Sequence, residues 1–400
     1  MKKYYLCGPT VYNYPHIGNI RPTVTFDLMI RAQRYLGENV YYLHNITDID
    51  DKIIKRAIEE NKTEKEIASF YEQYYWDIFK QFNLELPTKA VRVTDSLNEM
   101  YEYIQALIDK GAAYQKGVNV FFDVEKYKNV YGSISGQKLD NLNYDNDKFD
   151  KKNPSDFALW KDTNEGVKYN SPFGLGRPGW HTECSCFINK YFNGETLDYH
   201  GGGLDLIFPH HENENIQHYA LHNAPISKGW LHFGTINYKD QKMSKSIGNL
   251  IFPHTFLEKY DPETYKLMIL TTNYAKPINI TDQLFDTNQK LVNKFKNLWN
   301  KYQLEEKQFT VDLDVVKTIM QLVANLEFAN AYKEIFTLTK DENNLNTFFY
   351  ILRNLGFAFL DQYVSKNDIE TYKQWKQAVA DKNYELSDEL RAQLQERKLI

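Results

Sequence analysis

The first fifty residues alternate between strand and helix patterns, and no other feature of the chain restricts its fold as strongly. Residues 3–7 form an apolar, aromatic run that predicts a strand, and residues 40–43 predict a second one. Between them we expect a helix from about His16, stopped by Gly37, a residue suited to a helix C-terminus. Its apolar face is formed by residues four apart: Val24, Leu28, Ala32 and Leu36. A helix between two consecutive strands favours parallel pairing and a right-handed crossover, so the pattern predicts an α/β fold.

The carboxyl ends of parallel strands are where such a fold binds its ligands. Cys7 ends the first predicted strand, and Thr47 belongs to a polar turn predicted over residues 45–48. No Gly-x-Gly-x-x-Gly turn follows the first strand, so a dinucleotide site is not expected there. The sequence therefore places Cys7 and Thr47 at the ligand-binding edge of the sheet and gives no indication of a dinucleotide there.

The middle of the chain has the pattern of an insertion between two halves of one nucleotide-binding fold. A helix is expected over residues 96–110 and a short aromatic strand over 118–124. A stretch rich in Asn, Asp and Lys over residues 141–154 predicts a loop.

Strand and helix patterns resume after the insertion. Strands are expected over residues 197–200 and 230–237, with a helix that begins at Pro209 between them. From about Asp261 the pattern is helical to the end, and the final segment carries Leu386, Leu390 and Leu394 four residues apart. We expect this last segment to pack into a helical bundle.

Composition and charge exclude several classes of protein. With 42% hydrophobic and 25% charged residues, the 400-residue chain is not wholly disordered. No apolar run approaches the roughly 20 residues of a membrane helix, and the first residues lack the apolar core of a secretory signal. Three cysteines cannot form a disulfide-built scaffold, so we expect a cytoplasmic enzyme with reduced thiols. The net charge of −5 gives no global attraction for nucleic acid, which would need a local basic surface.

Four residues from three segments have the chemistry of a tetrahedral zinc site. His210 and Glu214 are four apart on a probable helix, so their side chains share a face. Cys7 and Cys184 complete the set if both lie at neighbouring strand ends. Cys186 fits less well, because a spacing of two from Cys184 separates the side chains in helix and strand alike. The same residues would equally suit two buried structural cysteines beside a capped helix with ordinary histidines.

Two motifs have the composition of phosphate-binding segments. His16-Ile17-Gly18-Asn19 opens the first helix, where backbone amides attract anions and Gly18 permits close approach. Lys242-Met243-Ser244-Lys245-Ser246 follows a predicted strand, and its two lysines can neutralise a triphosphate. Either motif alone also suits a solvated surface segment, but both in this order, on opposite halves of one fold, favour nucleotide binding.

With these residues identified, the chain resembles the cysteinyl-tRNA synthetases, a family of class I aminoacyl-tRNA synthetases. The resemblance extends from Cys7 to about Leu399. It rests on the two phosphate motifs and on six further segments: residues 7–12, 45–52, 153–157, 177–181, 201–205 and 208–214.

The resemblance implies a role for each of these positions. Cys7, Cys184, His210 and Glu214 match the ligands of a Zn²⁺ ion. Residues expected at bound L-cysteine are Cys7, Gly8, Thr47, Trp180, His200 and His211. Residues expected at Mg²⁺-bound ATP are Pro9, Thr10, His16, Gly18, Asn19, Gly202, Asp205 and Lys245. His16, Asn19, Lys242 and Lys245 are the expected catalytic residues.

The resemblance also implies a division of labour along the chain. We expect a Rossmann-like parallel-sheet catalytic domain split by an insertion, followed by an all-α C-terminal helical bundle. The predicted parts are residues 1–83 and 177–241 for the catalytic halves, 84–176 for the connective insertion, 242–300 for the KMSKS loop and stem-contact region, and 301–400 for the bundle on the anticodon side of tRNA-Cys. Lys290, Lys294, Lys296 and Lys301 give the helix before Gln303 a basic face for tRNA, although such a face is also typical of a solvated helix. A monomer is expected.

One position departs from the family pattern, and two other functions remain open from sequence. Asn19 stands where the family usually has histidine, and an amide can donate a hydrogen bond but carries no charge. We expect normal folding and slower activation of the amino acid as a result. A related ligase that transfers cysteine to an amino sugar would share the zinc and nucleotide motifs, and a non-catalytic tRNA-binding paralogue would share the fold.

Overall fold

The computed structural model describes residues 1–141, 150–244, 246–308 and 310–400, which form two compact units. The first unit contains residues 1–22, 39–78 and 86–235, and the second contains residues 23–38, 79–85 and 236–400. Helices α1 (Ile17–Tyr35) and α3 (Glu64–Gln81) contribute residues to both units.

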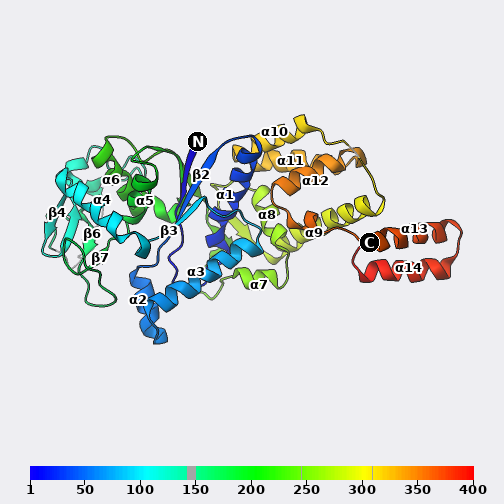
Figure 1. Cartoon of the computed structure of the whole chain (residues 1–400), viewed down its shortest axis with the longest axis horizontal. Coiled ribbons are helices and arrows are strands. Elements are labelled where there is room, and N and C mark those ends of the chain that lie inside the picture. Colours follow the sequence, from blue (N-terminus) through cyan, green and yellow to red (C-terminus); the bar gives the residue numbers. More distant parts are fainter. Residues whose placement is uncertain (142–149, 245, 309) are drawn as a thin grey trace. The chain divides into compact units, whose positions relative to one another are not determined.

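A five-stranded parallel sheet forms the centre of the first unit (Figure 1). Its order is β3-β2-β1-β8-β9, and every neighbouring pair is parallel. The predicted α/β class with a parallel sheet is therefore confirmed. The strands are β1 (Lys2–Leu6), β2 (Val40–Ile46), β3 (Lys89–Arg92), β8 (Leu197–Gly203) and β9 (Ser227–Phe233).

The order of the strands creates a crevice beside β1. The chain moves outward in one direction from β1 to β2 and in the other from β8 to β9. Right-handed crossovers place the connecting helices of these two halves on opposite faces of the sheet. Ligands of such folds bind at the carboxyl ends of the strands where the chain reverses direction across the sheet, which here are the ends of β1 and β8.

The helices of the first unit begin close to the predicted positions. Helix α1 starts one residue after His16, and Gly37 follows its end with a φ of 86°. The expected start at Pro209 also fits: Phe208 has extended backbone angles, and the helical residues that follow it lead directly into α6, which begins at Glu212. The helices lying wholly in this unit are α2 (Asp51–Glu60), α4 (Leu97–Asp109), α5 (Glu183–Tyr191) and α6 (Glu212–His222). Shorter helical turns cover Thr94–Ser96, Val124–Tyr127, Leu139–Asn141 and Leu204–Leu206.

The polar turn predicted at residues 45–48 was partly wrong, because Asn45 and Ile46 still belong to β2. Polar side chains are tolerated there since each finds a buried partner: the Asn45 Oδ1 accepts from the Gly8 amide at 2.7 Å, and the Thr47 hydroxyl donates to Glu183 at 2.6 Å. Buried polar residues at a strand end thus position other groups and do not turn the chain towards solvent.

The inserted segment forms a separate sheet between the halves of the parallel one. It is antiparallel, in the order β4-β5-β6-β7. Its strands are β4 (Ala113–Lys116), β5 (Asn119–Phe122), β6 (Phe157–Lys161) and β7 (Arg177–Pro178). Most of the loop predicted over residues 141–154 lies outside the described residues.

The second unit is mainly helical, and all its described residues from 301 onward lie in helices or their connections. Its helices are α7 (Pro253–Leu257), α8 (Pro262–Leu270), α9 (Asp282–Leu304), α10 (Leu313–Ala324), α11 (Phe328–Leu338), α12 (Leu345–Asn354), α13 (Lys366–Ala380) and α14 (Tyr384–Glu396), with short turns at Glu342–Asn344 and Ala358–Asp361.

Two predictions for this unit differ from the structure: the wholly helical character beyond Asp261 and the packing of all three leucines of the last segment. Strands β10 (Ile236–Tyr238), β11 (Gln241–Lys242) and β12 (Ile278–Ile280) form a small sheet, so the chain beyond Asp261 is not helical throughout. Helices α13 and α14 lie side by side (Figure 1). Leu390 and Leu394 are buried as expected, but Leu386 is exposed.

A fully buried lysine links several segments of the second unit. The three N–H groups of the Lys266 ammonium have three acceptors: Asp27 Oδ2 at 3.0 Å and the backbone carbonyls of Asn83 and Gly356 at 2.9 and 3.0 Å. The other oxygen of Asp27 accepts from Arg31 Nε at 2.9 Å. Every donor of this lysine is therefore satisfied by the protein itself.

Candidate metal centre at the sheet edge

Four donor groups converge at the carboxyl end of β1. Cys7 directly follows this strand, and its amide donates to the Gly201 carbonyl of β8 at 3.0 Å. His210 lies in the turn before α6 and Glu214 in the first turn of that helix. Cys184 is the second residue of α5, so the expectation that it lies at a strand end was wrong. Cys184, His210 and Glu214 are buried, whereas Cys7 is partly exposed.

The distances among these groups fit one tetrahedral metal ion. Two sulfur atoms bound to zinc at about 2.3 Å lie about 3.8 Å apart in tetrahedral geometry, and a sulfur and a nitrogen about 3.6 Å apart. The Cys7 and Cys184 sulfurs are 4.0 Å apart, and Cys184 Sγ is 3.5 Å from His210 Nε2. One donor atom from each of the four residues lies within 4.8 Å of all the others. Small adjustments of the side chains would therefore complete the coordination of a zinc-sized ion.

The electrostatics of the cluster favour a cation. Burial raises the pKa of Cys7 to about 11 and that of Cys184 well above its usual value. Burial alone would raise the pKa of Glu214 and lower that of His210. Attraction to His200 and His210 prevails and holds the pKa of Glu214 well below its usual value, and attraction to Glu214 raises the pKa of His210 to about 10. One buried and one partly exposed thiol beside a buried carboxylate form an electron-rich group that a divalent cation would stabilise.

Neighbouring side chains hold the donors in place, and among them His181 and Ser185 were given no role from the sequence. His181 Nδ1 lies 3.2 Å from His210 Nδ1, and the Trp180 ring stacks on the His210 ring with centroids 4.2 Å apart. The Ser185 hydroxyl donates to the Glu214 backbone carbonyl at 2.9 Å. Ser185 directly follows the candidate ligand Cys184 and His181 precedes it by three residues, and this proximity in sequence is the signal that could have found them. Cys186 is buried and belongs to neither of the two metal-compatible clusters among the described residues.

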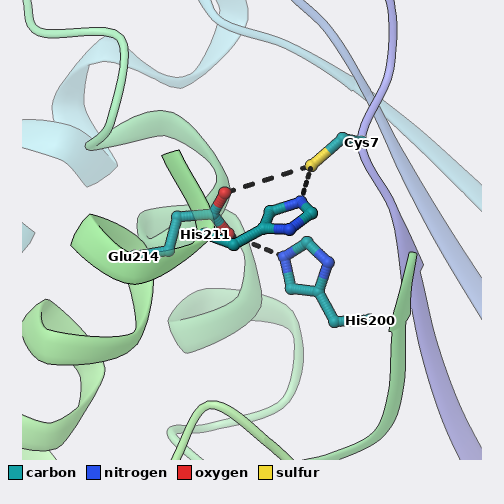
Figure 2. Close-up of side chains that lie close together, drawn as sticks. All are labelled: Cys7, His200, His211 and Glu214. Atoms are coloured by element: carbon teal, nitrogen blue, oxygen red, sulfur yellow. Dashed lines mark hydrogen bonds and ion pairs between the residues drawn. The ribbon is translucent and has the colours of Figure 1, made fainter. Parts of the chain in front are cut away.

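The residues expected at the amino acid surround this cluster. Gly8 has no room for a side chain, because a Cβ would lie 1.6 Å from the Asn45 carbonyl oxygen. Thr47 is bonded to Glu183, a residue that sequence reasoning missed. His200 Nε2 lies 2.7 Å from Glu214 Oε2, and His211 Nε2 lies 3.6 Å from Cys7 Sγ (Figure 2).

The first phosphate motif forms a compact loop at the start of α1. The His16 Nδ1 accepts from the Gly18 amide at 3.1 Å, and the Asn19 side chain accepts from the His16 amide at 3.0 Å. Pro9 and Thr10 lie beside Thr47, whose amide donates to the Pro9 carbonyl at 3.1 Å. The side chains of His16 and Asn19 thus shape the helix N-terminus that sequence reasoning assigned to the nucleotide.

The other predicted nucleotide residues lie in three places. Gly202 is in β8, where a Cβ would approach the His211 ring to 2.8 Å, and Asp205 lies in the turn that follows the strand. Lys242 ends β11 in the second unit, and its carbonyl accepts from the Asn249 side chain at 3.3 Å. Lys245 lies outside the described residues.

Comparison with known proteins decides the family. Residues 1–290 match the model of the tRNA synthetases class I (C) catalytic domain. The cysteine–tRNA ligase of Mesomycoplasma hyopneumoniae strain 232 is 41% identical over 98% of the chain and 96% of its own length. The chain belongs to the cysteine–tRNA ligase family. The corresponding enzyme of Malacoplasma penetrans is 40% identical over the whole chain and 95% of its own length.

Solved structures agree on the fold of this family member. Methionyl-tRNA synthetase of Mycobacterium tuberculosis, in complex with methionyl-adenylate, superimposes with a TM-score of 0.66 over 94% of each chain at 14% identity. The LeuRS of Agrobacterium radiobacter K84, in a ternary complex with tRNA, gives a TM-score of 0.68 over 90% of this chain and 84% of its own at 10% identity. These superpositions show a Rossmann-like fold, and the family model over residues 1–290 places the chain among the class I tRNA synthetases. Within the described ranges, no helix combines the length and apolarity needed to cross a membrane.

Proposed function

We propose that the chain joins L-cysteine to the 3′ end of tRNA-Cys through cysteinyl-adenylate and that Cys7, Cys184, His210 and Glu214 hold the zinc ion of this reaction. The convergence of these four donors at the open edge of the parallel sheet carries the proposal. The names and near-complete overlap of the relatives support the same activity.

The donor set matches zinc better than a hard cation. Two thiols, an imidazole and one carboxylate are soft or borderline ligands, whereas Mg²⁺ and Ca²⁺ prefer oxygen. When bound, zinc would favour the deprotonated thiol of cysteine over the hydroxyl of serine. A purely apolar pocket separates such similar side chains by only about a hundredfold. The metal would therefore supply the selectivity.

The chain's own residues would bind and orient the reactants around the ion. Gly8, Thr47, Trp180, His200 and His211 would line the space for the cysteine. Close approach of the nucleotide would use the backbone of Gly18 and Gly202, and Asp205 would accept from ribose hydroxyls. Residues assigned to the phosphates of Mg²⁺-bound ATP are Pro9, Thr10, His16, Asn19, Lys242 and Lys245.

No protein nucleophile is needed for either step. The cysteine carboxylate attacks the α-phosphorus of ATP, and the bond to the β-phosphate breaks, releasing pyrophosphate. A terminal ribose hydroxyl of the tRNA then attacks the carbonyl of the adenylate, AMP leaves, and the hydroxyl proton passes to solvent or phosphate. Lys242 and Lys245 would stabilise the charge that develops on the departing pyrophosphate. The protein contributes through positioning and charge stabilisation.

The basic face of α9 would contact the tRNA backbone. Residues 287–304 contain four lysines and no acidic residue, and a groove of about 400 Å³ runs along Lys290, Asn293, Lys294, Asn297, Leu298 and Lys301. Lys296 and Lys301 already pair with Asp261 and Glu342. Lys290 and Lys294 have no ion pair among the described residues, so they are the pair that we assign to phosphate. The parts proposed for tRNA remain residues 242–300 and 301–400, in a cytoplasmic monomer.

Pyrophosphate exchange tests the zinc proposal directly. We expect exchange with cysteine, none with serine, and loss of the cysteine signal after chelation that zinc restores. Equal exchange with serine, or exchange that survives complete metal removal, would contradict it. The transfer step is tested by offering tRNA-Cys and an amino sugar as acceptors in parallel assays. Transfer of cysteine to the sugar alone would refute the proposed tRNA ligase activity.

The α9 assignment has a matched pair of double variants. Lys290→Ala with Lys294→Ala should raise the KM for tRNA and reduce its salt dependence, while cysteine-dependent exchange stays unchanged. Lys296→Ala with Lys301→Ala, which removes lysines already paired with acids, should change the KM for tRNA less. The reverse order would show that the unpaired lysines are only solvated.

A further inference from the structure

Two overlapping sets of metal donors meet at Cys7 and Glu214. The first is the proposed zinc set, completed by Cys184 and His210. The second is completed by His200 and His211, and its four donor atoms also lie within 4.8 Å of one another. Figure 2 shows this second set, with His200 contributed by β8, His211 by the turn before α6, and Cys7 by the end of β1.

The Glu214 carboxylate offers a different oxygen to each set. Its Oε1 lies 2.9 Å from His210 Nε2 on the first side, and its Oε2 lies 2.7 Å from His200 Nε2 on the second. Cys7 Sγ is shared in the same way, 4.0 Å from Cys184 Sγ and 3.6 Å from His211 Nε2. Two-metal sites in proteins hold their ions about 3.5–4 Å apart, and a carboxylate that offers one oxygen to each side can bridge such a pair.

The surroundings of the second set support metal binding. His211 Nδ1 lies 3.1 Å from His232 Nε2, a ring nitrogen in the place where metal-bound histidines usually have a carboxylate, a backbone carbonyl or water. The Trp230 ring stacks on His200 with centroids 4.6 Å apart and restricts its rotation. His200 Nδ1 has no hydrogen-bond partner among the described residues, so His211 is the better-supported ligand.

We propose that Cys7, His200, His211 and Glu214 form a second, weaker position for a soft divalent cation beside the zinc site. Because His200 and His211 are the residues proposed for the cysteine pocket, an ion there would occupy space intended for the substrate side chain. The inference rests on the proposed function for the identity of the first site, but its donors can be tested separately.

Titration of the metal-depleted full-length protein with Co²⁺ tests the proposal. Bound metal is measured by equilibrium dialysis, and thiolate ligation by the near-ultraviolet charge-transfer band of Co²⁺. We expect two ions per chain, with the second bound at least about tenfold more weakly because its bridging donors are already neutralised by the first. Uptake of a single ion by the wild type would overturn the proposal.

Reciprocal variants assign the two binding steps. His211→Gln should lose the weaker step and keep the tighter one, and Cys184→Ser should keep one ion through the second set. His222→Gln, which changes an exposed histidine at the end of α6, should still bind two ions. Unaltered thermal unfolding of each metal-free variant shows that the chain still folds.

The outcomes separate this inference from the proposed function. If His211→Gln still binds two ions, or His222→Gln loses one, the second position is not the one proposed. If Cys184→Ser leaves the tighter step unchanged, the zinc assignment is wrong, whatever happens to the second step.

Discussion

Two clusters of polar side chains, one in each unit, differ in whether the protein itself supplies all of their hydrogen-bond partners. Around Lys266, each ammonium hydrogen has its own acceptor and Asp27 is bonded on both oxygens. Around Cys7, two thiols, a carboxylate and histidines meet with donors and acceptors poorly matched. The thiol and histidine pKa values are displaced far from their ordinary range. The first arrangement is closed and stabilises the fold, whereas the second needs a ligand.

Removing one donor from the Cys7 cluster, called here the open group, tests this difference most directly; the Lys266 cluster is called the closed group. Cys184→Ser should reduce cysteine-dependent pyrophosphate exchange at least about 1,000-fold and weaken zinc binding, because a hydroxyl is a poor zinc ligand. Cys186→Ser, two residues further along the same helix and equally buried, is the control and should keep both properties. Similar losses in the two variants would mean that Cys184 is a packing residue.

Removing the lysine from the closed group should act on stability alone. Lys266→Met leaves Asp27 buried without its partner and should lower the free energy of unfolding by about 3–5 kcal/mol. Chelation of metal should not alter this loss. Lys259→Met, at an exposed position, should change stability by less than about 0.5 kcal/mol. A loss in Lys266→Met that depends on zinc would show that the two groups are not independent.

The open group should also respond to pH in a way that the closed one does not. The pKa of Cys7 is about 11, that of His210 is about 10, and that of Cys184 is raised, so the metal-free centre holds these protons near neutrality. A metal ion must displace them, so zinc affinity should rise with pH, by at least about tenfold from pH 6.5 to 7.5. Competition with a chromophoric chelator measures this, and equal affinity at the two pH values would contradict the proposed ligands.

The smallest effect concerns the packing of the closed group. At Gly356, φ is 78° and a Cβ would lie 2.7 Å from Arg31 Cζ and 2.8 Å from Lys266 Nζ. At Gly37, φ is 86° but a Cβ would meet no atom within 4 Å. Gly37→Ala should cost about 1 kcal/mol for its backbone conformation, and Gly356→Ala at least about 2 kcal/mol, because it also displaces the ion network. Equal losses in chemical denaturation would show that the network accommodates the methyl group.

Local patterns were reliable where a segment's environment depends on its own residues. The parallel pair β1–β2, the start of α1 and the helical C-terminal region all follow from apolar periodicity and from Gly37. Errors arose where distant residues decided the outcome. Asn45 stays in β2 because Gly8 provides a buried partner, and Leu386 remains exposed although it shares the spacing of Leu390 and Leu394.

The candidate site was predictable in its residue types but not in its connections. Spacing paired His210 with Glu214, the chemistry of a zinc site added Cys7 and Cys184, and the resemblance implied the same four residues. The alternative set through His200 and His211, and the supporting residues Glu183 and His181, carry no periodic signal. They are contributed by a strand, a turn and a helix whose proximity is set by the packing of the whole first unit.

Periodicity and motif identity are properties of neighbouring residues, so the class of fold, the family and most of the chemical groups available for catalysis could be predicted from the sequence. That one carboxylate faces two donor sets, and that Lys266 has an acceptor for each donor, became visible in the folded chain. The state of a buried group depends on the direction and number of its partners, and those partners come from segments far apart in the chain.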